Sequence, residues 1–225
     1  MGFQLAEQGK LLPLPPRSER RILIIGDSIS CGYGNEATRD EGNPLDKENG
    51  YMTYGGIAAR KLNAELQIVA WSGRKLYPNN TMVELYDRAL AMEDKPKADL
   101  KGWVPGVVLI NLGTNDFGNR NSLPDKQGWI GAYKGFIKTI RRTAPGAYIF
   151  VASGPMGTAA EWDAWAKAVV ADLNQAGDDK VAYLPFPTQD INRDGIGGHW
   201  HPNLKTHAKM ADRLVKEIGK AVDWK

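Results

Sequence analysis

Ser28 is the first residue in this chain whose type and place could do chemistry. It ends the tripeptide Gly26-Asp27-Ser28, directly after the apolar run of residues 22–25. If that run is a buried strand, the turn after it would present the hydroxyl at the carboxyl edge of a sheet, where a base could activate it as a nucleophile. Taken alone, the tripeptide fits a helix cap and a turn glycine better. Ser28 is therefore a candidate that needs partners.

Two further strand ends carry suitable partners. Gly73 follows the apolar run at residues 67–71, and Asn115 follows the run at residues 107–112. Acyl transfer through a serine needs about two or three fixed donors for the oxyanion, and backbone N–H groups and an Asn amide are such donors. Each residue taken singly is an ordinary turn residue. Their occurrence after three apolar runs in succession indicates an oxyanion site.

A general base of the imidazole type has few sources here, because the chain has only three histidines, His199, His201 and His207. His201 directly precedes Pro202, at the expected start of the last helix, and is the best candidate. His207 falls inside that helix and is interpreted as a surface or packing residue. The pair His199 and His201 could also bind a metal, but no third ligand stands at a suitable spacing. Cys31 is interpreted as a buried structural thiol.

Strands and helices alternate in the pattern needed to position these residues. Five short runs rich in Ile and Val are predicted strands, at residues 22–25, 67–71, 107–112, 147–152 and 181–184. Apolar residues at helical spacing predict helices at residues 127–142 and 208–222, and a further helix is expected at 54–66. Continuous apolar strands separated by helices predict an α/β fold with a parallel sheet covered on both faces.

Local signals mark further boundaries. Thr81 with Glu84 and Thr158 with Glu161 have the capping-box pattern, which predicts two more helix starts. Residues 32–50 form a long loop after the first strand, expected either to wall the site or to be a solvated insertion. Residues 1–20 contain three prolines and are interpreted as a tail or linker, which leaves residues 21–225 as one domain.

Composition excludes several functional classes. The 225 residues are 42% hydrophobic and 24% charged, which is typical of a folded globular protein. The net charge of +3 is spread along the chain, so a nucleic-acid partner is not expected. The apolar runs are too short to span a membrane, and no secretory signal is recognised, which leaves localisation open. A single cysteine cannot form an intramolecular disulfide.

Taken together, these blocks resemble the SGNH or GDSL hydrolase superfamily. Gly26-Asp27-Ser28, Gly73, Gly113-Thr114-Asn115-Asp116 and His201-Pro202-Asn203 occur in that superfamily's order. Within it, residues 25–36, residues 48–51 and Trp200-His201-Pro202 resemble carbohydrate esterase family 2, whose members remove acetyl groups from plant polysaccharides.

The resemblance implies a three-layer α/β/α flavodoxin-like fold with Ser28 as nucleophile and His201 as base. Ser28, Gly73 and Asn115 would supply the oxyanion donors, and no cofactor or metal is expected. The implied partner is an acetylated carbohydrate. Trp200, next to the base, would offer an aromatic face to a sugar ring, although a core tryptophan is the more frequent interpretation.

Two departures from the family pattern affect what is expected. Members of family 2 usually carry an N-terminal jelly-roll domain, whereas this chain begins in what resembles the linker after it. Superfamily members also commonly have Asp three residues before the histidine, where this chain has Gly198. We therefore predict a Ser28–His201 dyad in which a backbone carbonyl accepts from Nδ1 of the imidazole. Asp190 and Asp194 are the nearest upstream carboxylates that could replace the missing acid.

Two other functions fit the same residues. One is a lipid-directed or thioester-directed SGNH hydrolase with a different substrate groove. The other is a catalytically silent glycan-binding module that keeps the fold. Retention of all four chemical positions favours an enzyme.

Overall fold

The computed structural model describes residues 4–13, 16–41, 44–119, 121–157 and 159–224. Its centre is a five-stranded, all-parallel sheet in the order β2-β1-β3-β4-β5. The strands are β1 (Arg21–Gly26), β2 (Glu65–Ala70), β3 (Val107–Asn111), β4 (Tyr148–Ser153) and β5 (Val181–Pro185). All five predicted strands are therefore confirmed, with bounds that differ by one or two residues.

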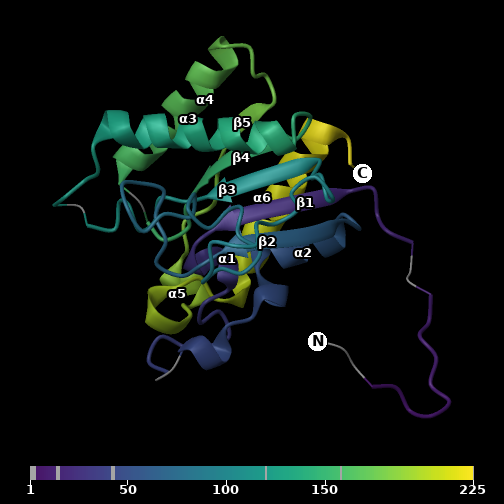
Figure 1. Cartoon of the computed structure of the whole chain (residues 1–225). Helices are drawn as coiled ribbons and strands as arrows, with labels where there is room; N and C mark the ends of the chain where they lie inside the picture. The colour runs from purple at the N-terminus through teal and green to yellow at the C-terminus, as the bar shows by residue number, and fades with distance from the viewer. Residues whose placement is uncertain (1–3, 14–15, 42–43, 120, 158, 225) are drawn as a thin grey trace.

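Helices cover both faces of the sheet, which confirms the three-layer α/β/α fold (Figure 1). One face packs against α2 (Tyr54–Lys61) and α6 (Leu204–Val222), and the other packs against α3 (Lys126–Thr143) and α4 (Ala160–Gln175). Along β1, Ile22 and Ile24 join the first core, and Leu23 and Ile25 join the second. Side chains of a strand alternate between its faces, so a strand covered on both sides reads as an unbroken apolar run.

Short elements gather at the carboxyl ends of the strands. They are α1 (Ser28–Cys31), α5 (Ile191–Asp194) and the 3₁₀ helices Pro44–Lys47, Gly50–Met52 and Gly198–Trp200. Figure 1 shows α1 and α5 at this end, opposite the end where the N-terminal tail enters β1. Gly26 allows α1 to start immediately, because a Cβ there would lie 2.0 Å from Ser30 Oγ. Strand β1 thus ends at Gly26, Asp27 is the N-cap, and helix α1 begins at Ser28.

The helix predicted at Thr81 is wrong, although its capping pair forms. Glu84 N donates to Thr81 Oγ1 over 3.3 Å, but the chain continues as turns. Backbone groups that a helix would pair internally are used elsewhere: Ala89 N donates to Pro96 O, and Asp87 O accepts from Ala98 N. Tertiary pairing within residues 71–106 therefore overrides the local signal.

Two other predicted helix boundaries are the end of the helix at residues 54–66 and the helix start at Thr158. The helix expected at residues 54–66 ends at Lys61, because Asn63 adopts a left-handed φ of 49° and Glu65 already belongs to β2. Thr158 lies outside the described residues. Helix α4 begins at Ala160 with Glu161 in its first turn and no side-chain cap at Ala159.

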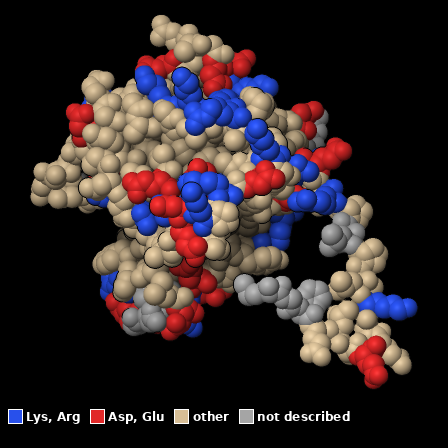
Figure 2. Space-filling view, viewed as in Figure 1, with Lys and Arg blue, Asp and Glu red and all other residues tan. Residues whose placement is uncertain are grey.

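The N-terminal segment projects away from the body of the domain before it enters β1 (Figure 1). Its described residues have no helix or strand until Arg21, but Arg17 forms a bidentate ion pair with Glu65 at 2.8 and 2.9 Å. Figure 2 shows Lys and Arg interspersed with Asp and Glu over the visible face. In the described part of the chain, no helix has the length and apolar character to cross a membrane.

Candidate active site

Ser28 and His201 meet at the carboxyl edge of the sheet, although 173 positions separate them in the chain. Ser28 Oγ lies 2.9 Å from His201 Nε2. Ser28 is placed by the start of α1, and His201 by the turn between the 3₁₀ helix Gly198–Trp200 and α6. Burial lowers the pKa of His201 below its usual 6.5, with its hydrogen bond to the His199 carbonyl opposing this. The imidazole is therefore neutral at pH 7, as a general base must be.

The tautomer of His201 follows from its other nitrogen. Nδ1 lies 3.0 Å from the carbonyl oxygen of His199, which can only accept, so Nδ1 carries the proton and Nε2 is free to accept from Ser28. This contact depends on an unusual backbone, because His199 and Trp200 adopt positive φ values of 48° and 66°. Non-glycine residues in this region store strain of about 1–3 kcal/mol each and occur preferentially at functional sites.

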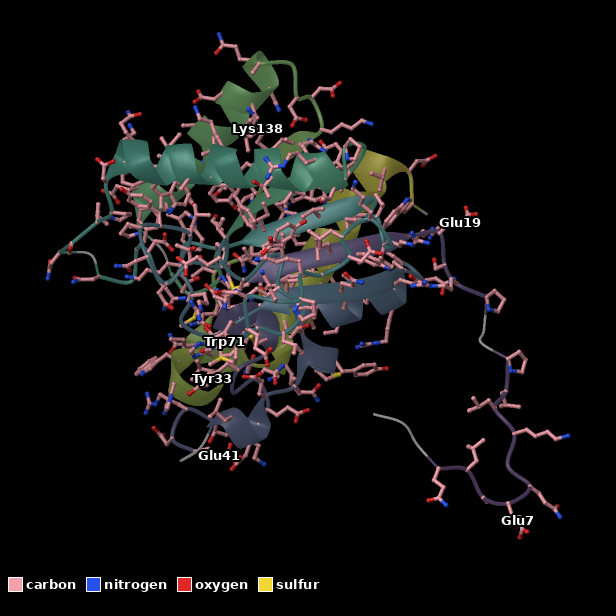
Figure 3. The ribbon with its side chains drawn as sticks, in the orientation of Figure 1. Glu7, Glu19, Tyr33, Glu41, Trp71 and Lys138 are labelled. Atoms are coloured by element: carbon pink, nitrogen blue, oxygen red, sulfur yellow. The ribbon has the colours of Figure 1, made fainter. Side chains whose placement is uncertain are left out.

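Tyr33 and Gly34, at the start of the loop after α1, brace the histidine segment. Tyr33 Oη lies 3.1 Å from His199 Nδ1, and the Tyr33 ring packs 4.7 Å from the ring of His201. Gly198 N donates to Gly34 O over 2.9 Å. Figure 3 places Tyr33 and Trp71 at the same end of the molecule as α1 and α5. Tyr33 was missed by sequence reasoning, because only the folded loop brings it to the imidazole.

Gly73 and Asn115 lie on the turns that flank Ser28, because β2 and β3 are the neighbours of β1. Gly73 is exposed with a φ of 77°, and within the described residues its N–H has no hydrogen-bond partner. Asn115 Nδ2 donates to Arg74 O over 2.8 Å and approaches Asp27 Oδ2 at 3.4 Å. The amide of Asn115 thus joins the turn after β2 to the turn after β1.

Asp27, the residue before Ser28, is a fully buried carboxyl group that sequence reasoning did not single out. It caps α1 by accepting from Ile29 N over 3.1 Å. Burial, with a smaller contribution from the negative charge of Asp116, raises its pKa to about 7 against hydrogen bonds that lower it. Its position in the Gly-Asp-Ser motif was the only available signal.

Comparison with known proteins places the chain in a family. Residues 24–209 match the model of the GDSL-like lipase/acylhydrolase family. The chain is 42% identical to the cellulase/esterase CelE of Acetivibrio thermocellus over all of its own length, and 26% identical to an acetylxylan esterase / glucomannan deacetylase of Cellvibrio japonicus over 96% of it. A family two carbohydrate esterase from Clostridium thermocellum, solved in complex with cellohexaose, superposes with a TM-score of 0.89 at 42% identity, over 96% of this chain and 68% of that one.

The chain belongs to carbohydrate esterase family 2, within the GDSL-like lipase/acylhydrolase family. It spans 28% of the length of CelE and 61% of the Cellvibrio relative.

In this family 2 domain, both upstream carboxylates that could have replaced the triad acid are engaged elsewhere. Asp190 caps α5 by accepting from Arg193 N over 3.1 Å. Asp194 pairs with the ammonium group of Lys209, which lowers the pKa of that carboxyl group. The imidazole of His201 contacts Ser28, the His199 carbonyl and the Tyr33 ring. The geometry is that of a dyad.

Trp200 of the family 2 domain stands beside the base and is 52% exposed. The guanidinium of Arg39 lies 5.1 Å from its ring centroid and covers one face. Gln189 Nε2 donates to the Trp200 carbonyl over 3.0 Å and holds the backbone. The Trp200 side chain thus lies at the surface, unlike that of a core tryptophan, with one face of its ring under Arg39.

The other polar candidates have structural contacts. His207 is buried in α6 and accepts from Tyr54 N over 3.2 Å, as a packing residue would. Burial raises the pKa of Cys31 to about 12, which makes its thiol inert at neutral pH. Over the part of the chain that the structure describes, no group of three or more His, Cys, Asp or Glu residues could hold a metal ion.

Proposed function

We propose that this chain is a serine esterase that removes O-acetyl groups from carbohydrate through an acyl-enzyme on Ser28. The observation that carries the proposal is the 2.9 Å contact between Ser28 Oγ and a His201 whose tautomer is set by a carbonyl. The names of the relatives, an esterase and an acetylxylan esterase / glucomannan deacetylase, support the acetyl group and the carbohydrate.

The reaction proceeds in two halves. His201 Nε2 takes the Ser28 proton as Oγ bonds to the acetyl carbonyl carbon, and the N–H groups of Ser28 and Gly73 stabilise the negative charge on the carbonyl oxygen. The Asn115 amide becomes the third donor when it exchanges its 3.4 Å bond to Asp27 Oδ2 for the oxyanion and keeps its 2.8 Å bond to Arg74 O. The bond to the sugar oxygen then breaks, and that oxygen takes the proton from His201. A water molecule gives a proton to His201 and attacks the acetyl-enzyme, which releases acetate and returns the proton to Ser28.

Among the residues that the structure describes, no carboxylate hydrogen-bonds to the imidazole of His201, so the imidazolium that forms in each half lacks that partner. The His199 carbonyl fixes its orientation and offers a partial negative charge, which is weaker stabilisation than a triad acid provides. Trp200 is next to His201 in the chain, with Arg39 over one face of its ring, and these two side chains would receive the sugar ring of the leaving group.

The proposal is tested by measuring acetate release from acetylated xylan, acetylated glucomannan and simple sugar acetates. Acetate release by the parent and none by Ser28→Ala is the expected result, with a serine-directed phosphonate labelling Ser28 alone. Faster cleavage of nitrophenyl octanoate than of the acetate would instead indicate a lipase-like enzyme. Glycan binding without turnover of any acetyl ester would indicate a silent binding module.

A further inference from the structure

Asp116 is a buried carboxylate that the mechanism above leaves without a task. It directly follows Asn115 and is 7% exposed. Leu76 N and Tyr77 N donate to it over 3.0 and 2.9 Å, and the indole Nε1 of Trp129 donates over 3.0 Å. None of the ion pairs between described residues includes Asp116. Its hydrogen bonds thus come from neutral N–H groups, and the charge of Lys75 adds a smaller stabilisation of the carboxylate, so that burial and these interactions oppose each other in setting its pKa.

These bonds reach the turn that carries Gly73. Leu76 and Tyr77 are three and four residues beyond Gly73, in a segment without helix or strand. The side-chain amide of Asn115 also binds this segment, because it donates to the Arg74 carbonyl. Asn115 and Asp116 therefore bind the backbone after β2 at both ends of the four-residue stretch 74–77. Asn115 donates to the Arg74 carbonyl, and Asp116 accepts from the N–H groups of Leu76 and Tyr77.

Gly73 is otherwise restrained mainly by the turn in which it lies, where Arg74 N donates to Trp71 O over 3.2 Å. It is exposed, a Cβ at its position would meet nothing within 4 Å, and its carbonyl receives only a 3.3 Å bond from the exposed Asn80. An exposed turn with few packing contacts opens easily. An oxyanion donor, however, must stay close to one position, since a misplacement of about 1 Å can cost on the order of 10² in rate.

We propose that Asp116 is a positioning residue of the oxyanion hole, which fixes the Gly73 N–H by holding the amides of Leu76 and Tyr77. The inference rests on the proposed esterase function. A carboxylate suits this task because it has acceptors only and can take several N–H donors at once. An asparagine of the same shape would turn an NH₂ group toward at least one of these donors.

The test compares Asp116→Asn with a matched control, Asp178→Asn. Asp178 is a half-buried carboxylate that accepts two hydrogen bonds from Arg141, and it lies far from the site, beyond the C-terminus of α4 and near the amino end of β5. For Asp116→Asn we expect kcat on nitrophenyl acetate to fall by about 10- to 100-fold with KM within about twofold, because the donor acts mainly in the transition state. Asp178→Asn should keep kcat within about twofold.

A second measurement reports on the oxyanion hole directly. Methylboronic acid accepts an electron pair from Ser28 Oγ while His201 takes the proton, and the tetrahedral adduct places a boron-bound oxygen in the hole. Its inhibition constant should rise in Asp116→Asn by the same factor by which kcat falls. A kcat within twofold of the parent, or a large loss of kcat with unchanged boronate inhibition, would overturn the proposal.

Amide hydrogen exchange on the unmodified protein keeps the proposal testable if Asp116→Asn fails to fold. The Leu76 and Tyr77 amides should exchange at least about 100-fold more slowly than in an unstructured peptide. Exchange at the peptide rate would show that the carboxylate does not hold them. This measurement needs no turnover, so failure of the positioning role is distinguished from failure of the esterase function, which acetate release reports.

Discussion

His201 and His207 lie six residues apart, and the fold gives them opposite tasks. Both have a pKa lowered by burial, His207 to about 3. His201 sits on a strained turn with one nitrogen on a carbonyl and the other on the Ser28 hydroxyl. His207 sits within α6, stacked on Tyr54, and within the described part of the chain its Nε2 has no hydrogen-bond partner. A lowered pKa therefore marks a base only where the free nitrogen faces a reactive group.

The largest expected effect separates the two histidines by activity. His201→Ala should lower kcat by about 10⁴ or more, since a serine without its base keeps only the oxyanion hole and binding. His207→Gln should keep kcat within about tenfold, because the Gln oxygen can still accept from Tyr54 N. Steady-state kinetics on nitrophenyl acetate checks both, and a greater loss in His207→Gln would reverse the assignment.

The pH dependence of kcat/KM should show that no carboxylate is paired with His201. Burial lowers the pKa of His201 below 6.5, and no described carboxylate pairs with it to raise that pKa. We therefore expect kcat/KM to reach half of its maximum at a pH below 6.5, where His201 becomes protonated, and to fall about tenfold per pH unit below that midpoint. The profile of the parent on nitrophenyl acetate gives the midpoint. A midpoint above 6.5 would indicate a carboxylate close to the imidazole.

His207 should contribute to the pH dependence of the free energy of unfolding. Its folded pKa of about 3 lies below the usual 6.5, so the stability it contributes is complete above pH 6.5 and is lost as pH falls toward 3. Between about pH 6 and pH 4, His207→Gln should reduce the slope of the unfolding free energy by up to about 1.4 kcal/mol per pH unit. Urea unfolding across that range measures it. Equal slopes in the parent and the variant would mean that His207 is charged in the folded protein.

Trp200 tests whether the surface beside His201 recognises sugar. Trp200→Ala should reduce kcat/KM on acetylated oligosaccharides several-fold more than on nitrophenyl acetate, since only the former has a sugar ring to stack. His207→Gln serves as the control, with equal effects on both substrates. Equal losses in Trp200→Ala would assign the ring to supporting the turn.

The smallest expected effects test the dyad itself. Asp190→Asn and Asp194→Asn should each keep kcat within about tenfold, because the first carboxylate caps α5 and the second pairs with Lys209. A loss approaching 10⁴ in either variant would identify a displaced triad acid. The parent midpoint of the pH profile should persist in both.

The elements of the fold were largely predictable. Runs such as residues 22–25 and 107–112 are apolar at every position because both sheet faces are covered, and this pattern is local. The helix predicted at Thr81 failed because backbone groups of residues 71–106 pair with partners distant in that segment, which no window of sequence records.

The sequence allowed the site residues to be predicted from their residue types and their order along the chain, but not from their contacts. Ser28 and His201 could be named because motif residues follow strand ends, and strand ends meet at one edge of a parallel sheet. Asp116 was within a motif and still went unassigned, because its task depends on which amides face it.

The sequence by itself determined the alternation of strands and helices, the serine at the first strand end and the lack of a carboxylate three residues before His201, because each is a local pattern of residue types. Only the tertiary structure decided that the His199 carbonyl meets Nδ1 of His201 and that Asp116 holds the turn of Gly73. Hydrogen bonds between distant turns depend on backbone direction to within a few tenths of an ångström, and that direction exists only once the layers have packed.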